Sequence, residues 1–253
     1  MTVLLIPGAG GDAWIWHRVE SELVAAGHDV VTVDLPADVE AAGIEQYATA
    51  AVSAVGSRSV DLVVGLSLGS FTAALVCLEI PATALIFVNG MIPVPGETPG
   101  EWWGATGQAE ARAANDRQEG RDPDADFDPM EVFFHDVPAD VILDAGRHNR
   151  VQSNSPFASP WALSTLPEVP THVVVGRNDR FFPAGFQARI SEERLGIAPD
   201  FLDGGHLLPL SRPVELAALL ASYLPPLQPG GTPVDQRREV VDDLRRPDRK
   251  QTP

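Results

Sequence analysis

The sequence predicts an α/β protein built on a doubly wound, mostly parallel sheet. Short apolar runs rich in β-branched residues alternate with longer segments of helical periodicity along most of the 253 residues, as expected for parallel strands joined by helical crossovers. Polar turns that contain glycine follow several of the apolar runs. The carboxyl ends of parallel strands share one edge of a sheet, so residues far apart in the sequence can meet there.

Six strands and five helices are expected. The strands are short apolar runs, placed at residues 3–6, 30–34, 62–66, 84–88, 172–176 and 200–202. The helices fill the connections that parallel strands need, at residues 15–26, 44–57, 67–79, 184–195 and 213–223. This order favours a single large domain over two small ones.

The third expected strand runs directly into Gly65-Leu66-Ser67-Leu68-Gly69, a Gly-x-Ser-x-Gly motif between a strand and a helix. A serine on so sharp a turn needs neighbours without bulk, and the two glycines provide them. The turn lifts the hydroxyl of Ser67 clear of the sheet and directs the N-terminus of the following helix at the same place. Ser67 is therefore the candidate nucleophile.

An acid and a base follow, each in a turn after a strand. Asp179 stands in the polar turn after residues 172–176, and His206 ends the glycine turn after residues 200–202. An unassisted serine hydroxyl is too weakly acidic to react at neutral pH, so His206 is the candidate base and Asp179 the group that holds its tautomer. The other histidines are interpreted as surface or packing residues, although we expect that His135 can face a substrate: His17, His28, His135, His148 and His172.

A glycine-rich loop, Pro7-Gly8-Ala9-Gly10-Gly11, follows the first strand. With this loop, the serine turn and the turns that carry Asp179 and His206, the chain resembles the α/β-hydrolase superfamily over residues 2–224, in a short form that lacks the N-terminal hairpin. The order Ser, Asp, His is that of this superfamily. Pro7 stands where the family commonly has a histidine that braces the loop.

The resemblance implies a role for each of these positions. Ser67, Asp179 and His206 would form a catalytic triad, and the backbone N–H groups of Ala9 and Leu68 would form the oxyanion hole.

The same loop also supports a rival interpretation. Gly8-x-Gly10-x-x-Ala13 after a strand, with Asp34 ending the next strand, fits a dinucleotide-binding fingerprint and predicts a nicotinamide reductase. That hypothesis leaves Ser67, Asp179 and His206 unexplained. Because Lys250 is the only lysine, a Tyr-x-x-x-Lys dehydrogenase site, a Walker phosphate loop and a lysine Schiff base are excluded.

Residues 89–166 interrupt the alternation and divide the expected hydrolase core into residues 1–88 and 167–224. An unstructured loop of that length is uncommon, so helices are expected within it. In the resembled superfamily an insertion here forms a cap over the catalytic serine. The candidate pocket residues are mostly aromatic, and the alternative is that they pack the cap onto the core: Trp102, Trp103, Phe134, His135 and Trp161.

Composition limits the partners. A net charge of −17 argues against nucleic acid and anionic membrane surfaces as partners and is interpreted as favouring solubility; the expected partner is a small-molecule substrate. No pattern of His, Cys, Asp or Glu has the spacing of a metal site, and neither a metal nor a cofactor is expected. The only cysteine, Cys77, cannot form an internal disulfide and is expected to be a buried apolar residue.

The two ends of the sequence suggest a location. The first residues are interpreted as a strand and not as a signal peptide, and no apolar stretch is long enough to span a bilayer, so we expect a cytoplasmic protein. Residues 225–253 are rich in proline and charge, and we expect a disordered tail without a catalytic part.

Together these features predict a serine hydrolase that cleaves a carboxylic ester, or a related acyl bond, of a small and largely apolar molecule. A first alternative is a lyase or cofactor-free cyclase on the same fold, with His206 as general base and no acyl-enzyme. More distant alternatives are the dinucleotide-binding reductase and a non-catalytic ligand receptor.

Overall fold

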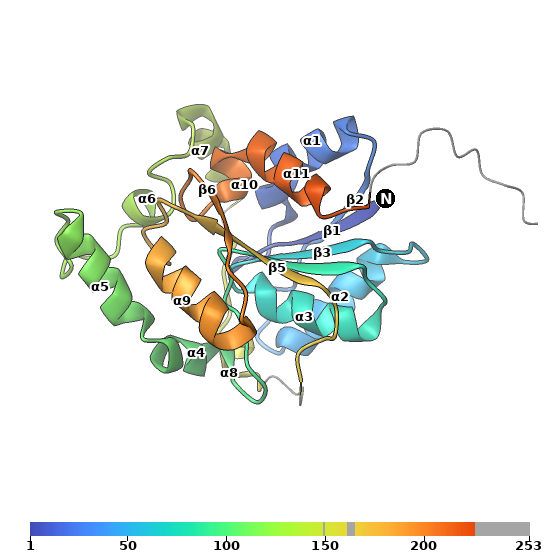
Figure 1. Cartoon of the computed structure of the whole chain (residues 1–253), viewed down its shortest axis with the longest axis horizontal. Helices are drawn as coiled ribbons and strands as arrows, with labels where there is room; N and C mark the ends of the chain where they lie inside the picture. The colour runs from blue at the N-terminus through green and yellow to red at the C-terminus, as the bar shows by residue number, and fades with distance from the viewer. Residues whose placement is uncertain (149, 161–164, 226–253) are drawn as a thin grey trace, which may run out of the picture.

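The centre of the molecule is a six-stranded parallel sheet (Figure 1). The computed structural model describes residues 1–148, 150–160 and 165–225. The strand order is β2-β1-β3-β4-β5-β6, and each neighbouring pair is parallel. The strands are β1 (Thr2–Ile6), β2 (Asp29–Thr32), β3 (Leu62–Leu66), β4 (Ala84–Val88), β5 (Thr171–Gly176) and β6 (Asp200–Leu202).

The central strands are apolar on both faces because helices cover both. Alternate residues of β1 belong to different cores: Leu4 and Ile6 pack on one side of the sheet, and Val3 and Leu5 on the other. A strand buried on both faces needs a continuous apolar run rather than an alternating one, and this explains why β1, β3 and β4 are wholly buried. The predicted doubly wound sheet is confirmed.

Two layers of helices flank the sheet (Figure 1). On one face α1 (His17–Ala25) packs against α11 (Pro213–Ser222), with α10 (Leu208–Ser211) beside them. On the other face lie α2 (Ile44–Val55), α3 (Gly69–Glu79) and α9 (Ala184–Leu195), with α2 packed against α3.

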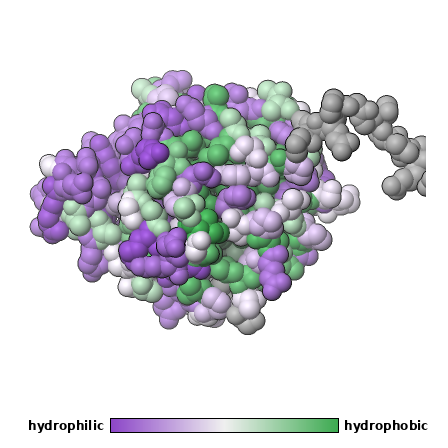
Figure 2. All heavy atoms as spheres, in the orientation of Figure 1, coloured by the Kyte–Doolittle hydropathy of each residue, from purple (hydrophilic) through white to green (hydrophobic). Residues whose placement is uncertain are grey.

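The long excursion between β4 and β5 contains the helices that the sequence predicted. They are α4 (Pro99–Thr106), α5 (Gln108–Gln118), α6 (Pro129–Val132), α7 (Ala139–Ala145) and α8 (Ser155–Ala158). We call residues 89–166 the cap. Figure 2 shows a strongly hydrophilic surface over α5, whereas Val141 of α7 packs against Leu210 of α10. The cap also contacts the core through the start of α5, where Gln108 donates to the carbonyl of Phe181 at 2.6 Å.

Several boundaries differ from those predicted, for local reasons. β2 ends two residues early because the chain turns aside, and the N–H of Leu35 donates to the carbonyl of Gly11 at 2.8 Å. The first helix begins at His17, after a 3₁₀ turn (η1, Ala13–Trp16) that the side chain of Asp12 caps. The predicted tail, apart from its first residue, lies outside the described residues.

The strand order reverses between β1 and β3. In open α/β sheets, ligands bind at such a switch point, beyond the carboxyl ends of the strands. The loop after β1 and the serine turn after β3 both lie there. None of the helices in the described ranges combines the length and the apolar character needed to cross a bilayer.

Candidate active site

The turn between β3 and α3 holds Ser67 in a strained conformation. Its φ is +51°, in the left-handed region that a residue with a side chain seldom occupies. The glycines on either side are required by close contacts. A Cβ on Gly65 would lie 2.6 Å from the carbonyl oxygen of Gly69, and a Cβ on Gly69 would collide with the carbonyl oxygen of Pro7. The helix expected from residue 67 therefore starts at Gly69.

Asp179 and His206 form a buried pair beyond β5 and β6. The Nδ1 of His206 lies 2.8 Å from Oδ2 of Asp179, and both residues are at most 3% exposed. The other carboxylate oxygen accepts the backbone N–H groups of Phe181 and Phe182, at 2.8 and 2.9 Å. Because both oxygens are engaged, the carboxylate is fixed in orientation and in turn fixes the imidazole. A ring held this way at Nδ1 presents Nε2 for proton transfer.

Asn89, which the sequence analysis did not single out, ties the histidine turn to the sheet. Its Oδ1 accepts the N–H of Gly176 at 2.7 Å, and its Nδ2 donates to the carbonyls of Gly205 and His206 at 3.0 and 2.8 Å. The residue is fully buried and has a φ of +41°. The signal available in the sequence was the pair Asn89-Gly90 directly after a buried strand, since asparagine tolerates left-handed turns.

Three phenylalanines surround the imidazole of His206. Its ring centroid lies 5.2 Å from that of Phe133, 5.3 Å from that of Phe181 and 5.1 Å from that of Phe182. Phe133 comes from the cap, and the other two follow Asp179. These rings keep water from the Asp179–His206 hydrogen bond, which strengthens it.

The loop after β1 brings backbone donors to the serine. Ala9 and Leu68 line the same cavity as Ser67, and within the described part of the chain neither of their N–H groups has a hydrogen-bond acceptor in the protein. The N–H of Gly10, by contrast, donates to Oε1 of Gln152 in the cap at 2.9 Å. Two unpaired donors therefore flank the serine.

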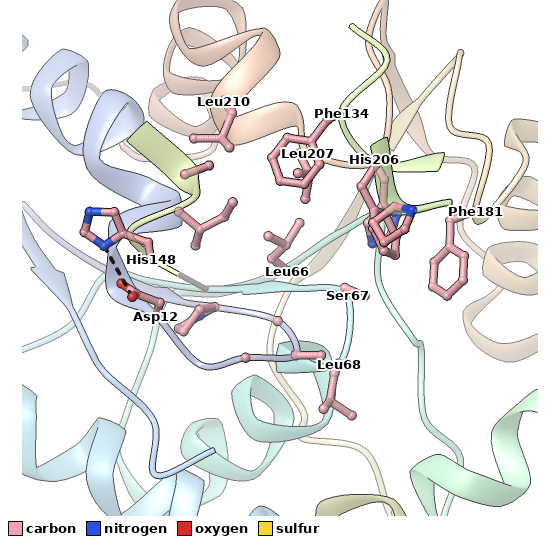
Figure 3. Close-up of a pocket in the computed structure, with 18 of the residues that line it drawn as sticks. Asp12, Leu66, Ser67, Leu68, Phe134, His148, Phe181, His206, Leu207 and Leu210 are labelled. Atoms are coloured by element: carbon pink, nitrogen blue, oxygen red, sulfur yellow. Dashed lines mark ion pairs between the residues drawn. The ribbon is translucent and has the colours of Figure 1, made fainter. Parts of the chain in front are cut away.

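A cavity of about 660 Å³ lies between the core and the cap. Ser67 and His206 lie close together on its wall, and Asp12 and His148 stand on the other side (Figure 3). Of the predicted pocket residues, the structure places Trp103 and Phe134 on this wall. Most other lining side chains are apolar, among them Met91, Phe157, Leu207 and Leu210.

Trp102 and His135 do not line the cavity. Trp102 is fully buried among Trp103, Phe182 and Phe186, and its Nε1 donates to the carbonyl of Ile92 at 3.1 Å. It packs the cap onto the core, the alternative that the sequence left open. Trp161 lies outside the described residues.

His135 lies behind the histidine turn, where its Nε2 would be 2.8 Å from a Cβ on Gly205. Asp136 accepts the N–H of Gly205 at 2.7 Å, so this part of the cap holds the turn. Burial lowers the pKa of His135, and the nearby charge of Arg180 lowers it further.

The other polar candidates have structural partners. Asp34 accepts the N–H of Ala13 at 2.8 Å and lies 3.6 Å from Arg150, so its carboxylate supports the glycine loop. Asp203, just before the glycine turn, pairs with Arg177 at 3.0 Å. Cys77 is buried, and burial raises the pKa of its thiol to about 12. Within the described residues, no three His, Cys, Asp or Glu side chains form a group able to hold a metal ion.

Known proteins resemble this chain in sequence and in fold. A model described as the alpha/beta hydrolase family matches residues 3–219. Methylesterase 3 of Arabidopsis thaliana is 31% identical over 114 residues, which cover 40% of this chain and 43% of the relative. Esterase PIR7B of Oryza sativa subsp. japonica is 35% identical over 112 residues, which cover 38% and 41%. The matched part thus spans less than half the length of these curated relatives.

Among solved structures, a pyrethroid hydrolase from Sphingobium faniae JZ-2 aligns with a TM-score of 0.68 at 20% identity, covering 88% of this chain and 96% of that one. The methylesterase MES16 from Arabidopsis aligns with a TM-score of 0.68 at 19% identity, covering 88% and 100%. At these identities the likeness concerns the fold.

Proposed function

The chain belongs to the alpha/beta hydrolase family, and on that premise we propose that it is a serine hydrolase that cleaves a carboxylic ester, or a related acyl bond, of a small and largely apolar molecule. One observation carries the proposal. One cavity is lined by the strained Ser67, by His206, and by Ala9 and Leu68 with their unpaired backbone N–H groups. The buried carboxylate of Asp179 lies behind this wall and holds His206.

In the proposed mechanism Ser67 Oγ attacks the acyl carbonyl carbon while Nε2 of His206 takes the hydroxyl proton. Asp179 holds the Nδ1 proton and stabilises the imidazolium that forms. The negative oxygen of the tetrahedral intermediate binds the N–H groups of Ala9 and Leu68. His206 then gives its proton to the departing alkoxide, which leaves as an alcohol. A water molecule, deprotonated by His206, releases the acid from Ser67 by the same steps.

The cavity supports a small apolar substrate. A volume of about 660 Å³ lies within the usual range for sites of small molecules. Trp103, Phe134 and Phe157 supply apolar surface, and the names of the curated relatives as methylesterase and esterase support an ester as the bond that is cleaved.

A lyase or cyclase on this fold would use His206 as a base without acylating the serine. The unpaired N–H groups of Ala9 and Leu68 favour acyl transfer, because that reaction generates an oxyanion at the place they face.

The experiment compares the unmodified chain with Ser67→Ala on short p-nitrophenyl esters. Loss of a triad member lowers turnover by about 10⁴–10⁶-fold, so Ser67→Ala is expected to retain almost no activity. Ser53→Ala, at an exposed serine of α2, is the control and keeps the activity. Mass spectrometry after rapid acid quenching should find an acyl group on the peptide that contains Ser67. Turnover of these esters without any acylated Ser67, or full activity of Ser67→Ala, would refute the acyl-enzyme mechanism and leave base catalysis by His206 as the alternative.

A further inference from the structure

The cap reaches the loop that carries Ala9 through one short segment. Its Arg150 donates to the carbonyl of Gly11 at 3.2 Å, and the N–H of Ser153 donates to the carbonyl of Ala37 at 2.7 Å. Between these two contacts, Oε1 of Gln152 accepts the N–H of Gly10 at 2.9 Å. The glycine loop is therefore held from the cap side, directly beside Ala9.

The carboxamide of Gln152 is fixed in one orientation. Its Nε2 donates to the hydroxyl oxygen of Tyr47 at 3.0 Å and to the carbonyl of Ser153 at 2.9 Å. A flipped amide would place its NH₂ group against the N–H of Gly10 and its oxygen against the carbonyl of Ser153. Tyr47 lies in α2 and is fully buried. A chain of contacts thus runs from α2 through Gln152 to the glycine loop.

The loop is held mainly through its backbone, since the N–H of Gly11 donates to the carbonyl of Gly8 at 3.1 Å and the N–H of Leu35 donates to the carbonyl of Gly11 at 2.8 Å. Gly10 and Gly11 have no side chains and adopt φ values of +85° and +64°. Pro7 has no N–H and no imidazole to brace the turn. The hydrogen bond from Gly10 to Gln152 occupies one of the donors in the loop, whereas the N–H of the preceding residue, Ala9, stays without an acceptor in the described protein and lies at the cavity.

We propose that Gln152 is a positioning residue for the oxyanion hole, and that it fixes the loop so that the N–H of Ala9 faces the developing negative charge. This inference rests on the proposed function. Gln152 acts through the backbone of Gly10 and is not among the residues that line the cavity. It takes over, from the cap, the bracing role left open by Pro7.

The position of a donor matters more to the transition state than to the bound ester. Losing one oxyanion donor costs about 10²–10³ in turnover, and a displacement of about 1 Å can cost about 10². Gln152→Leu keeps the size of the side chain but removes both the acceptor and the donor. We expect kcat to fall about 10–100-fold while KM changes less than about threefold, because an interaction made mainly in the transition state is weakened.

Two further readouts separate positioning from general damage. The inhibition constant of a trifluoromethyl ketone, which forms a tetrahedral oxyanion on the serine, should rise in proportion to the loss in kcat. Hydrogen exchange of the Gly10 amide, followed by NMR with labelled glycine, should be at least about fivefold faster in Gln152→Leu. Gln152→Glu keeps an acceptor oxygen for Gly10 but turns its second oxygen toward the carbonyl of Ser153, so it should slow the exchange of the Gly10 amide only in part.

The matched control is Gln46→Leu. Gln46 makes the same kind of bond, because its Oε1 accepts the N–H of a glycine, Gly43, at 2.8 Å. That bond caps α2 and lies outside the cavity, so this variant should keep its kcat.

Three results would overturn the proposal: unchanged exchange of Gly10 in Gln152→Leu, faster exchange with kcat within about twofold of the unmodified chain, or an effect on KM alone. An unmodified chain without esterase activity would contradict the proposed function itself, and the positioning role with it. The Gly10 exchange distinguishes the two failures, because it tests the hydrogen bond without any substrate.

Discussion

Replacing Asn89 by alanine is expected to destabilise the protein more than replacing any exposed polar residue. The side chain is fully buried and makes three hydrogen bonds, one to the N–H of Gly176 and two to the carbonyls of Gly205 and His206. Alanine leaves one donor and two acceptors in a place that water does not reach. It must also adopt the φ of +41° that asparagine tolerates better.

The expected loss follows from these contacts. Three hydrogen bonds at about 1 kcal/mol each account for about 3 kcal/mol of unfolding free energy, and the left-handed backbone adds about 1 kcal/mol for alanine. A total of about 4 kcal/mol is a large part of the 5–15 kcal/mol, roughly, that stabilises a typical domain. Activity should fall as well, because the carbonyl of His206 loses its anchor.

Urea unfolding of the variant and of the unmodified chain measures this loss. The control is Gln187→Met at another buried carboxamide. Gln187 donates to the carbonyl of Gly90 at 3.1 Å, but its Oε1 has no partner within the described residues. Removing one bond together with an unpaired acceptor should change the unfolding free energy by less than about 1 kcal/mol. An Asn89→Ala variant that loses no more than this control would refute the reasoning.

Three more predictions concern Gly69 in the serine turn, the thiol of Cys77 and the imidazole of His135. Gly69→Ala should lower the unfolding free energy by at least about 2 kcal/mol and reduce esterase activity, because its Cβ collides with the carbonyl of Pro7; urea unfolding at wild-type stability would contradict this. Because burial raises the pKa of Cys77 to about 12, a disulfide reagent at pH 8 should modify the thiol only after unfolding, and rapid labelling of the folded chain would contradict the burial. The pKa of His135 is lowered in the folded state, so the unfolded chain binds more protons and stability should fall as pH decreases below about 6.5. His135→Gln should flatten that part of the urea-unfolding profile, and an unchanged slope would exclude His135 as its source.

The strands and the three turns could be predicted from the sequence because local signals determine them. A strand covered on both faces must be apolar throughout, and the glycines around Ser67 are required by contacts within the same turn. Asp179 and His206 were found for the same reason, since each directly follows a strand. Their meeting follows from the parallel order of β5 and β6.

The rest of the site depends on contacts that no local pattern reveals. Trp102 and Trp103 are neighbours in α4, yet Trp102 is buried between the cap and the core, whereas Trp103 faces the cavity. Their difference depends on how α4 lies on Phe182 and Phe186. Gln152 is equally hard to identify from the sequence, because its partner, Gly10, lies 142 residues earlier in the chain. Asn89 gave a weak local signal, but its three partners belong to other strands and turns.

Because the cap is inserted between two adjacent strands, it could be replaced by a segment from another protein. β4 and β5 pair with each other whatever lies between them, and the entropy of closing a loop grows only by about 0.6 kcal/mol for each doubling of its length. The length of the segment could therefore be changed with little change in the stability of the sheet, provided that the exchange keeps Asn89 and the residues that pack on the core, such as Trp102. A transplanted segment that lacked an acceptor for the N–H of Gly10 would still fold onto the sheet, but the chimaera would turn over esters slowly. Whether a transplanted cap supplies this acceptor can thus be tested by the hydrogen exchange of the Gly10 amide.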